Sequence, residues 1–172
     1  MLLKEKNQSN VYIQEAIGLE LLCAEDFEGA IEMFKKALTT DRYQTYNYFN
    51  LARAYAMLDS QYKVREYLDK FTQLNPDYTQ GHINYAQWLI NVSDFEEAKR
   101  KLKKALKLEP DNLDALNMLF LTQFTLVKKN ICEYNIKVAI AIAQEAQSLG
   151  DFEYTPQKQE LEEMLNNLQL MS

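Results

Sequence analysis

The sequence is poor in residues that interrupt regular structure, with only four glycines and three prolines among 172 residues. A β-rich chain of this length needs many more turn residues, so their scarcity favours long helices. Hydrophobic residues make up 47% and charged residues 26%, a composition typical of a folded chain and not of a disordered one. We expect one all-α domain, because the length suits a single hydrophobic core.

Cysteine and histidine are also scarce. The two cysteines, Cys23 and Cys132, form no CxxC pair, so neither a zinc site nor a disulfide framework is indicated. The one histidine, His82, stands in a column of packing residues, and the sequence has no glycine-rich phosphate loop and no HExxH pattern. We therefore expect no catalytic residue, metal or cofactor, and the chain is predicted not to be an enzyme.

The balance of charge is acidic, with a net charge of -6. Because phosphate binding depends on Lys and Arg, this balance argues against nucleic acid as a partner. No apolar run is long enough for a membrane span or, in the first ten residues, for a signal peptide, so we expect a cytoplasmic protein without membrane contact. The basic run from Lys99 to Lys107 is a local exception, either a solvated outer face or a docking patch for acidic protein or RNA.

Similar residues recur at a spacing of 34 positions, the kind of fixed period that marks repeat proteins. Small Ala30 and Ala98 are each followed four residues later by a large residue, Phe34 or Leu102, at a spacing that places both on one helix face. The sequence thus predicts pairs of antiparallel helices. Further columns hold Ile17, Leu51, Tyr85 and Leu119; Gly18, Ala52, Ala86 and Phe120; Ala37, Phe71 and Ala105; and Pro76 with Pro110.

These columns, with the segments EDFEGAIEMFKKAL and SDFEEAKRKLKKALKLEPDN, resemble the tetratricopeptide repeat (TPR). The resemblance implies a right-handed α-α superhelix with three full repeats, a divergent fourth repeat and a C-terminal capping helix. The expected boundaries are an N-terminal tail at 1–10, repeats at 11–44, 45–78 and 79–112, a divergent helical pair at 113–150, and the capping helix at 151–172.

The fourth repeat departs from the period. The column of Ala98 continues not at Cys132 but seven residues later, at Ala139, which predicts an insertion and a long second helix from about Cys132 to Leu149. Gly150 and Asp151 should end that helix, and Thr155 with Pro156 should begin the last one. Asp77 and Asp111, which follow the repeat prolines, are predicted to cap the helices after them.

In the family that the sequence resembles, the first helices of successive repeats line a concave inner groove. Spacing of four, three and four residues selects the groove positions on these helices. Asn50 and Asn84 share one column, and their amides suit pairing with an extended peptide backbone, while Arg53 is available for a carboxylate. The candidate peptide-binding residues are Tyr12, Tyr46, Phe49, Asn50, Arg53, Ile83, Asn84 and Gln87. Of these, Phe49 and Ile83 are flanking apolar contacts outside the spacing. The spacing also selects Ala16, Leu19, Cys23, Met57, Gln80, Asn91, Asp114, Met118, Leu121 and Thr125.

The function that the resemblance implies is a protein-interaction scaffold that holds a peptide or helix of a partner protein in the groove. Two alternatives stay open: a small acidic chaperone similar to those of type III secretion, and a self-assembling structural module. We expect a monomer or a weak homodimer. The family's clamp for heat-shock chaperone tails is not expected, because its Lys, Asn and Arg positions hold Glu15, Leu19, Gln80 and Asn84, and only Asn50 agrees. In a self-assembling module, Met118, Leu121 and Phe124 would form the subunit contact.

Overall fold

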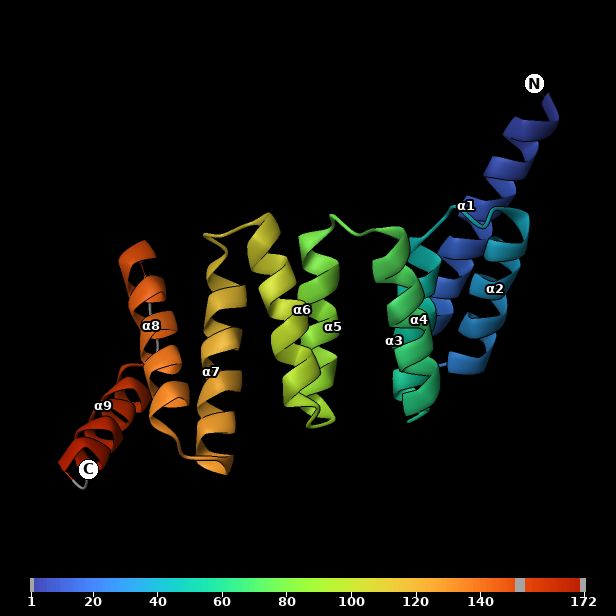
Figure 1. The fold of residues 1–172 in the computed structure, drawn as a ribbon. Helices are drawn as coiled ribbons and strands as arrows, with labels where there is room; N and C mark the ends of the chain where they lie inside the picture. The colour runs from blue at the N-terminus through green and yellow to red at the C-terminus, as the bar shows by residue number, and fades with distance from the viewer. Residues whose placement is uncertain (1, 151–153, 171–172) are drawn as a thin grey trace. The chain divides into compact units, whose positions relative to one another are not determined.

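The structure is a computed structural model that describes residues 2–150 and 154–170, with side chains from residue 10 onward. These residues form helices and no strand, which confirms the all-α fold class. Figure 1 shows the helices in chain order. They are α1 (Leu2–Cys23), α2 (Phe27–Thr40), α3 (Tyr46–Met57), α4 (Gln61–Leu74), α5 (Thr79–Asn91), α6 (Phe95–Leu108), α7 (Leu113–Lys129), α8 (Glu133–Leu149) and α9 (Thr155–Leu170).

The chain divides into two compact units, unit 1 from Met1 to Pro76 and unit 2 from Asp77 to Ser172. In unit 1, α1 packs against α2 and α3 against α4, and α2 also contacts α3. In unit 2, α5 packs against α6, α7 against α8, and α9 against α8, while α6 joins the two pairs by contacting α7. Each unit is therefore a stack of consecutive helix pairs, as the sequence pattern predicts, but the chain forms two compact units where a single core was expected.

The helix boundaries keep the period of the sequence. The second helices of the first three pairs begin at Phe27, Gln61 and Phe95, which are 34 residues apart. The turn before each of them contains a residue with a left-handed backbone, and these residues have the same spacing: Glu25 (φ 61°), Asp59 (φ 52°) and Ser93 (φ 62°). The repeat thus governs backbone conformation as well as side-chain type.

The predicted packing columns form the core of each unit. Ala30, Phe34 and Ala37 are fully buried in unit 1, and Ala98, Leu102 and Ala105 are fully buried in unit 2. A β-carbon added at Gly18 would lie 2.6 Å from the Phe34 ring, so glycine is what allows α1 to approach α2 this closely.

One column member does not behave as predicted. Leu51, Tyr85 and Leu119 are buried, but Ile17 in the same column is 40% exposed. The prediction that Ile17 packs like its counterparts is wrong, because no helix among the described residues precedes α1 to cover that face.

The two ends of the chain differ from the expected boundaries in different ways. Residues Leu2 to Asn10, expected as a tail, continue the first helix instead, since α1 begins at Leu2. In the fourth pair, α8 begins directly after Cys132 and ends at Leu149, before Gly150 with a φ of 143°, so the predicted long helix is confirmed. The helix-ending role predicted for Asp151 lies outside the described residues, as do Met1, residues 152–153 and residues 171–172.

The capping prediction for two aspartates is wrong. α5 begins after Tyr78 with no side-chain cap, two residues beyond the Asp77 position that was expected to cap it. α7 is capped by Asn112, whose side-chain oxygen accepts a hydrogen bond from the Ala115 amide at 2.9 Å. In both helices the capping position is one residue later than expected: Tyr78 instead of Asp77 for α5, and Asn112 instead of Asp111 for α7.

Two further features concern single helices. Within the described part of the chain, no helix combines the length and hydropathy that crossing a bilayer requires. The chain's single tryptophan, Trp88, lies on α5 in unit 2, where its ring contacts Tyr85 with centroids 6.0 Å apart.

Candidate functional site

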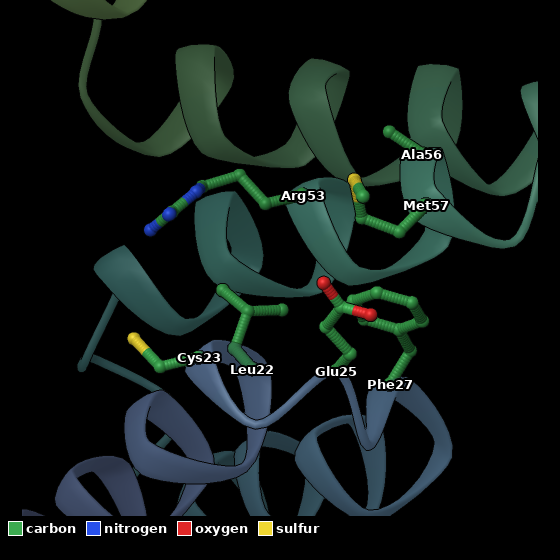
Figure 2. A pocket seen from close by; sticks show the side chains of 7 residues that line it. All are labelled: Leu22, Cys23, Glu25, Phe27, Arg53, Ala56 and Met57. Atoms are coloured by element: carbon green, nitrogen blue, oxygen red, sulfur yellow. The ribbon is translucent and has the colours of Figure 1, made fainter.

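Unit 1 carries an open cavity of about 380 Å³ where the ends of α1 and α3 meet the turn into α2 (Figure 2). Its walls are mainly apolar, and two charged side chains and one thiol reach it. A cavity of this size lies at the lower end of the range for ligand sites in proteins and suits one or two side chains of a ligand. We call it the first cavity, and it is lined by Leu22, Cys23, Glu25, Phe27, Arg53, Ala56 and Met57.

Local sequence features place these side chains. The left-handed backbone of Glu25 turns the chain after α1, and the Asp26 side chain accepts a hydrogen bond from the Gly29 amide at 3.0 Å, which starts α2. Phe27 thereby becomes the first residue of α2 and faces the cavity. On α3, Arg53 and Met57 are four residues apart and so lie on one face of the helix.

The charged groups of the first cavity are separated. Figure 2 shows the Arg53 guanidinium pointing toward the Cys23 side, away from the Glu25 carboxylate. Within the described residues, no ion pair joins Arg53 to Glu25. Both side chains are exposed, and so both charges are available to a ligand.

Unit 2 carries a second cavity of about 360 Å³, and its lining is mainly polar. α5 and α7 supply most of the wall, and Tyr154, just before α9, completes it with a ring stacked on Phe120 at 5.9 Å between centroids. The residues that line this second cavity are Gln80, Ile83, Asn84, Gln87, Asp114, Asn117, Met118 and Tyr154.

Amides dominate the second cavity. The Gln80 amide nitrogen donates to the Asn84 side-chain oxygen at 3.0 Å, a bond that does not use the Asn84 amide nitrogen. Gln87 likewise donates to Asn91 at 3.2 Å. Side-chain amides both donate and accept hydrogen bonds, as a peptide backbone does, and Asp114 adds a carboxylate to the same wall.

The structure brings four of the candidate residues to the cavities. Arg53 lines the first cavity, and Ile83, Asn84 and Gln87 line the second. Ile83 is buried apart from an exposed fraction of 4%, so only its edge reaches the cavity, while Gln87 is exposed.

The other four candidates lie elsewhere in unit 1. Tyr46 and Phe49 pack on Phe71, with ring centroids 5.6 and 5.4 Å apart, and half of the Tyr46 surface remains exposed. Asn50 is buried to 7% exposure, which leaves little of its amide for a ligand. Tyr12 is exposed on α1 and does not line either cavity.

The groove spacing found more of the lining than the shorter candidate set. Cys23 and Met57 in the first cavity, and Gln80, Asp114 and Met118 in the second, all stand at positions selected by that spacing. Residues outside regular spacing were missed. Glu25 comes from a turn, Phe27 is the first residue of α2, and Tyr154 comes from a connection, so the spacing along the first helices carries no signal for them.

The described residues contain no cluster of three or more His, Cys, Asp or Glu side chains that could hold a metal ion. Cys23 and Cys132 are both free thiols. The chemistry that both cavities offer is noncovalent: apolar contact, amide hydrogen bonds and single charges.

Comparisons with known proteins give a consistent picture. No family model matches the sequence. The protein STIP1 homolog of Dictyostelium discoideum is 26% identical over 95 residues, covering 55% of this chain but only 17% of that relative. The chain thus spans about a sixth of the length of that curated relative.

Solved structures match over more of the chain. The first TPR of Spaghetti (RPAP3), bound to the HSP90 peptide SRMEEVD, has a TM-score of 0.61 and 24% identity, covering 69% of this chain and 94% of that one. YrrB, described as a TPR protein with an unusual peptide-binding site, has a TM-score of 0.64 and 18% identity, covering 91% of this chain and 76% of that one.

The stacked helix pairs define the class: an α-helical repeat protein. Within that class the chain has the tetratricopeptide-repeat fold, which confirms the resemblance indicated by its sequence columns.

Proposed function

We propose that this chain is a protein-interaction scaffold that holds a peptide or a helix of a partner protein on the first helices of its repeats. One observation carries the proposal: the positions selected by groove spacing supply three lining residues of the first cavity and five of the second. Among TPR structures of similar fold, the first TPR of RPAP3 is bound to an HSP90 peptide and YrrB has a peptide-binding site, which supports the same use here.

The proposal favours binding over catalysis. Both cavities present amides, apolar side chains and isolated charges, and a nucleophile paired with a base is not among the lining residues. The free thiols fit a reducing compartment such as the cytoplasm, which we propose as the location.

A screen of synthetic peptides tests the function. Acetylated, C-terminally amidated twelve-residue peptides of random sequence would be screened on the whole chain, and hits measured by isothermal titration calorimetry. For hits that shift unit 2 amides in NMR spectra, we expect the double variant Asn84→Ala with Gln87→Ala to weaken binding about tenfold, because two hydrogen-bonding amides are lost.

The matched control replaces two exposed amides of unit 2 that do not line the cavity, Gln144→Ala with Asn167→Ala. This control should leave the affinity unchanged. Equal loss in both double variants, or no peptide binding at all, would contradict the proposed function.

The ligand we propose differs from a heat-shock chaperone tail because its C-terminal carboxylate is not recognised. Glu15 and Gln80 stand where the family's clamp needs lysines, so no pair of cations awaits a terminal carboxylate. Binding to peptides with a free or an amidated C-terminus should therefore agree within about twofold, a difference below the effect of a typical charged hydrogen bond.

One alternative function, the self-assembling structural module, is tested on the same protein. Light scattering over a range of concentrations tests self-assembly, for which Met118, Leu121 and Phe124 were the expected contact. Met118 already lines the second cavity, and Phe124 stacks on Phe120 at 6.1 Å between centroids. We propose a monomer, and mass that rises with concentration would favour the self-assembling module.

A further inference from the structure

The first cavity combines an apolar floor with a single available cation. Leu22, Phe27, Ala56 and Met57 supply the apolar surface, and Met57 keeps 63% of its own surface exposed. Covering exposed apolar surface is favourable in proportion to the area removed from water, so an apolar ligand side chain gains free energy here. Methionine is flexible and adapts its shape to such a side chain.

The charges of the cavity determine which type of ligand residue can stand next to the bound apolar residue. Arg53 is exposed and forms no ion pair among the described residues, and a guanidinium matches the planar shape of a carboxylate. Glu25 stands on another part of the lining, away from the Arg53 guanidinium, and would repel a carboxylate that approached there. A ligand carboxylate is therefore directed to the Arg53 side.

We propose that the first cavity recognises an extended segment of a partner protein in which a large apolar residue stands next to an aspartate or glutamate. The apolar side chain enters between Leu22, Phe27 and Met57, and the neighbouring side-chain carboxylate pairs with Arg53. This assignment rests on the proposed function and adds the ligand chemistry of unit 1. The net charge of -6 makes general attraction of acidic peptides weak, so the preference depends on Arg53 itself.

Four acetylated and amidated peptides of equal length, differing at two adjacent positions, test the assignment on the whole chain. The pairs are Leu-Glu, Leu-Lys, Ala-Glu and Ala-Lys in a Gly-Ser background. We expect the Leu-Glu peptide to bind tightest. Its affinity should be about fivefold to tenfold higher than that of Ala-Glu, because alanine buries less apolar surface than leucine. Its affinity should also be higher than that of Leu-Lys by up to about fivefold, the range for exposed ion pairs, and this difference should shrink in high salt.

A charge-reversal variant makes the test specific. Arg53→Glu should invert the preference so that Leu-Lys binds more tightly than Leu-Glu. Arg42→Glu is the matched control, because Arg42 is exposed in the same unit, changes the net charge equally and does not line the cavity. The control should keep the order of the original chain.

The two cysteines give an independent readout of position. Cys23 lines the first cavity and is exposed, whereas Cys132 directly precedes α8 in unit 2. Saturating Leu-Glu peptide should slow the alkylation of Cys23 by N-ethylmaleimide several-fold and leave the alkylation of Cys132 unchanged.

The possible failures are distinguishable. Binding of Leu-Glu that is unaffected by Arg53→Glu, or that leaves the Cys23 alkylation rate unchanged, would overturn this assignment while the scaffold function stands. Absence of binding for all four peptides would overturn the assignment, and only failure of the random-peptide screen as well would overturn the proposed function.

Discussion

Gly18 shows how a single residue sets the distance between two helices. Its α-carbon faces the fully buried Phe34 ring, and a β-carbon there would come within 2.6 Å of one ring atom and 2.9 Å of a second. The ring belongs to the core of unit 1, so it has little room to yield.

We predict that Gly18→Ala lowers the free energy of unfolding by about 1–3 kcal/mol, the usual range for overpacking, although alanine alone favours the helix. Urea denaturation followed by circular dichroism measures the change. Gly29→Ala gives a comparison, because the atoms nearest its added β-carbon belong to the exposed Asp26 side chain, and moving that side chain loses only the α2 cap, which costs about 1 kcal/mol. A second substitution, Phe34→Leu, should recover part of the loss in Gly18→Ala, and a stable Gly18→Ala protein would contradict the close approach.

The left-handed residues at the hairpin turns carry a small conformational cost. Non-glycine residues in this region cost about 1–2 kcal/mol, and glycine escapes that cost but loses more chain entropy on folding. Ser93 has a φ of 62° and is exposed. We predict that Ser93→Gly raises the free energy of unfolding by about 0.5–1 kcal/mol, measured by urea denaturation. Ser93→Ala should leave stability nearly unchanged, and a destabilised Ser93→Gly protein would refute the backbone assignment.

Glu66 on α4 gives a prediction for pH. Its two carboxylate oxygens accept hydrogen bonds from the Lys63 and Lys70 ammonium groups, each at 2.8 Å, and these contacts lower the pKa of Glu66 from 4.5 to about 2. A folded-state pKa below the unfolded one stabilises the protein above about pH 4.5, and this contribution is lost as the pH falls toward 2.

The size of that contribution should be small, because the lysines are well exposed and solvent screens the pair; we expect at most about 1 kcal/mol. Urea denaturation of the original chain and of Glu66→Gln at a series of pH values between 2 and 6 measures it. The stability difference should shrink as the pH falls. A difference independent of pH would show that the two lysines do not hold the carboxylate.

At the scale of the helices, the 34-residue period was predictable, but the start of α1 and the caps of α5 and α7 were not. The columns of Ala30, Phe34 and Ala98 predicted which helix faces are buried, and the shift to Ala139 predicted the longer helix of the fourth pair. These signals come from core packing, which constrains residue type at every turn. Ile17 shows the limit, since its column predicts a neighbour that the described chain does not supply.

The candidate site was predictable for the same reason and to the same extent. Residues on regular helices, such as Arg53, Asn84 and Gln87, follow from spacing. Glu25 and Tyr154 do not, because a turn and a connection can take many conformations that the local sequence does not select. Burial of Asn50 was also unpredictable from type alone, since asparagine is ordinarily exposed.

The positive charge of the basic run from Lys99 to Lys107 is partly paired with other side chains of unit 2. Arg100 pairs with Glu97, and Lys101 lies 3.7 Å from the same carboxylate and 4.0 Å from the centre of the Tyr85 ring. Part of the positive charge is therefore neutralised within unit 2. Lys103, Lys104 and Lys107 are exposed, so the choice between a solvated face and a docking patch rests on these three.

At the scale of the molecule, each unit has its own buried core. We predict that the fragments Met1–Pro76 and Asp77–Ser172, produced separately, are both helical and unfold cooperatively in urea, because each retains its complete stack of helix pairs. Far-ultraviolet circular dichroism of each fragment measures this. A fragment that is unstructured alone while the whole chain is folded would show that its core is insufficient.

Trp88 lies in unit 2, and unit 1 contains no indole. Emission from this single side chain therefore registers the melting of one unit, whereas peptide ellipticity registers both. If the fluorescence and ellipticity curves of the intact chain coincide, the two units unfold together. If the normalised curves differ, the difference reports the unfolding of unit 1, which has no tryptophan.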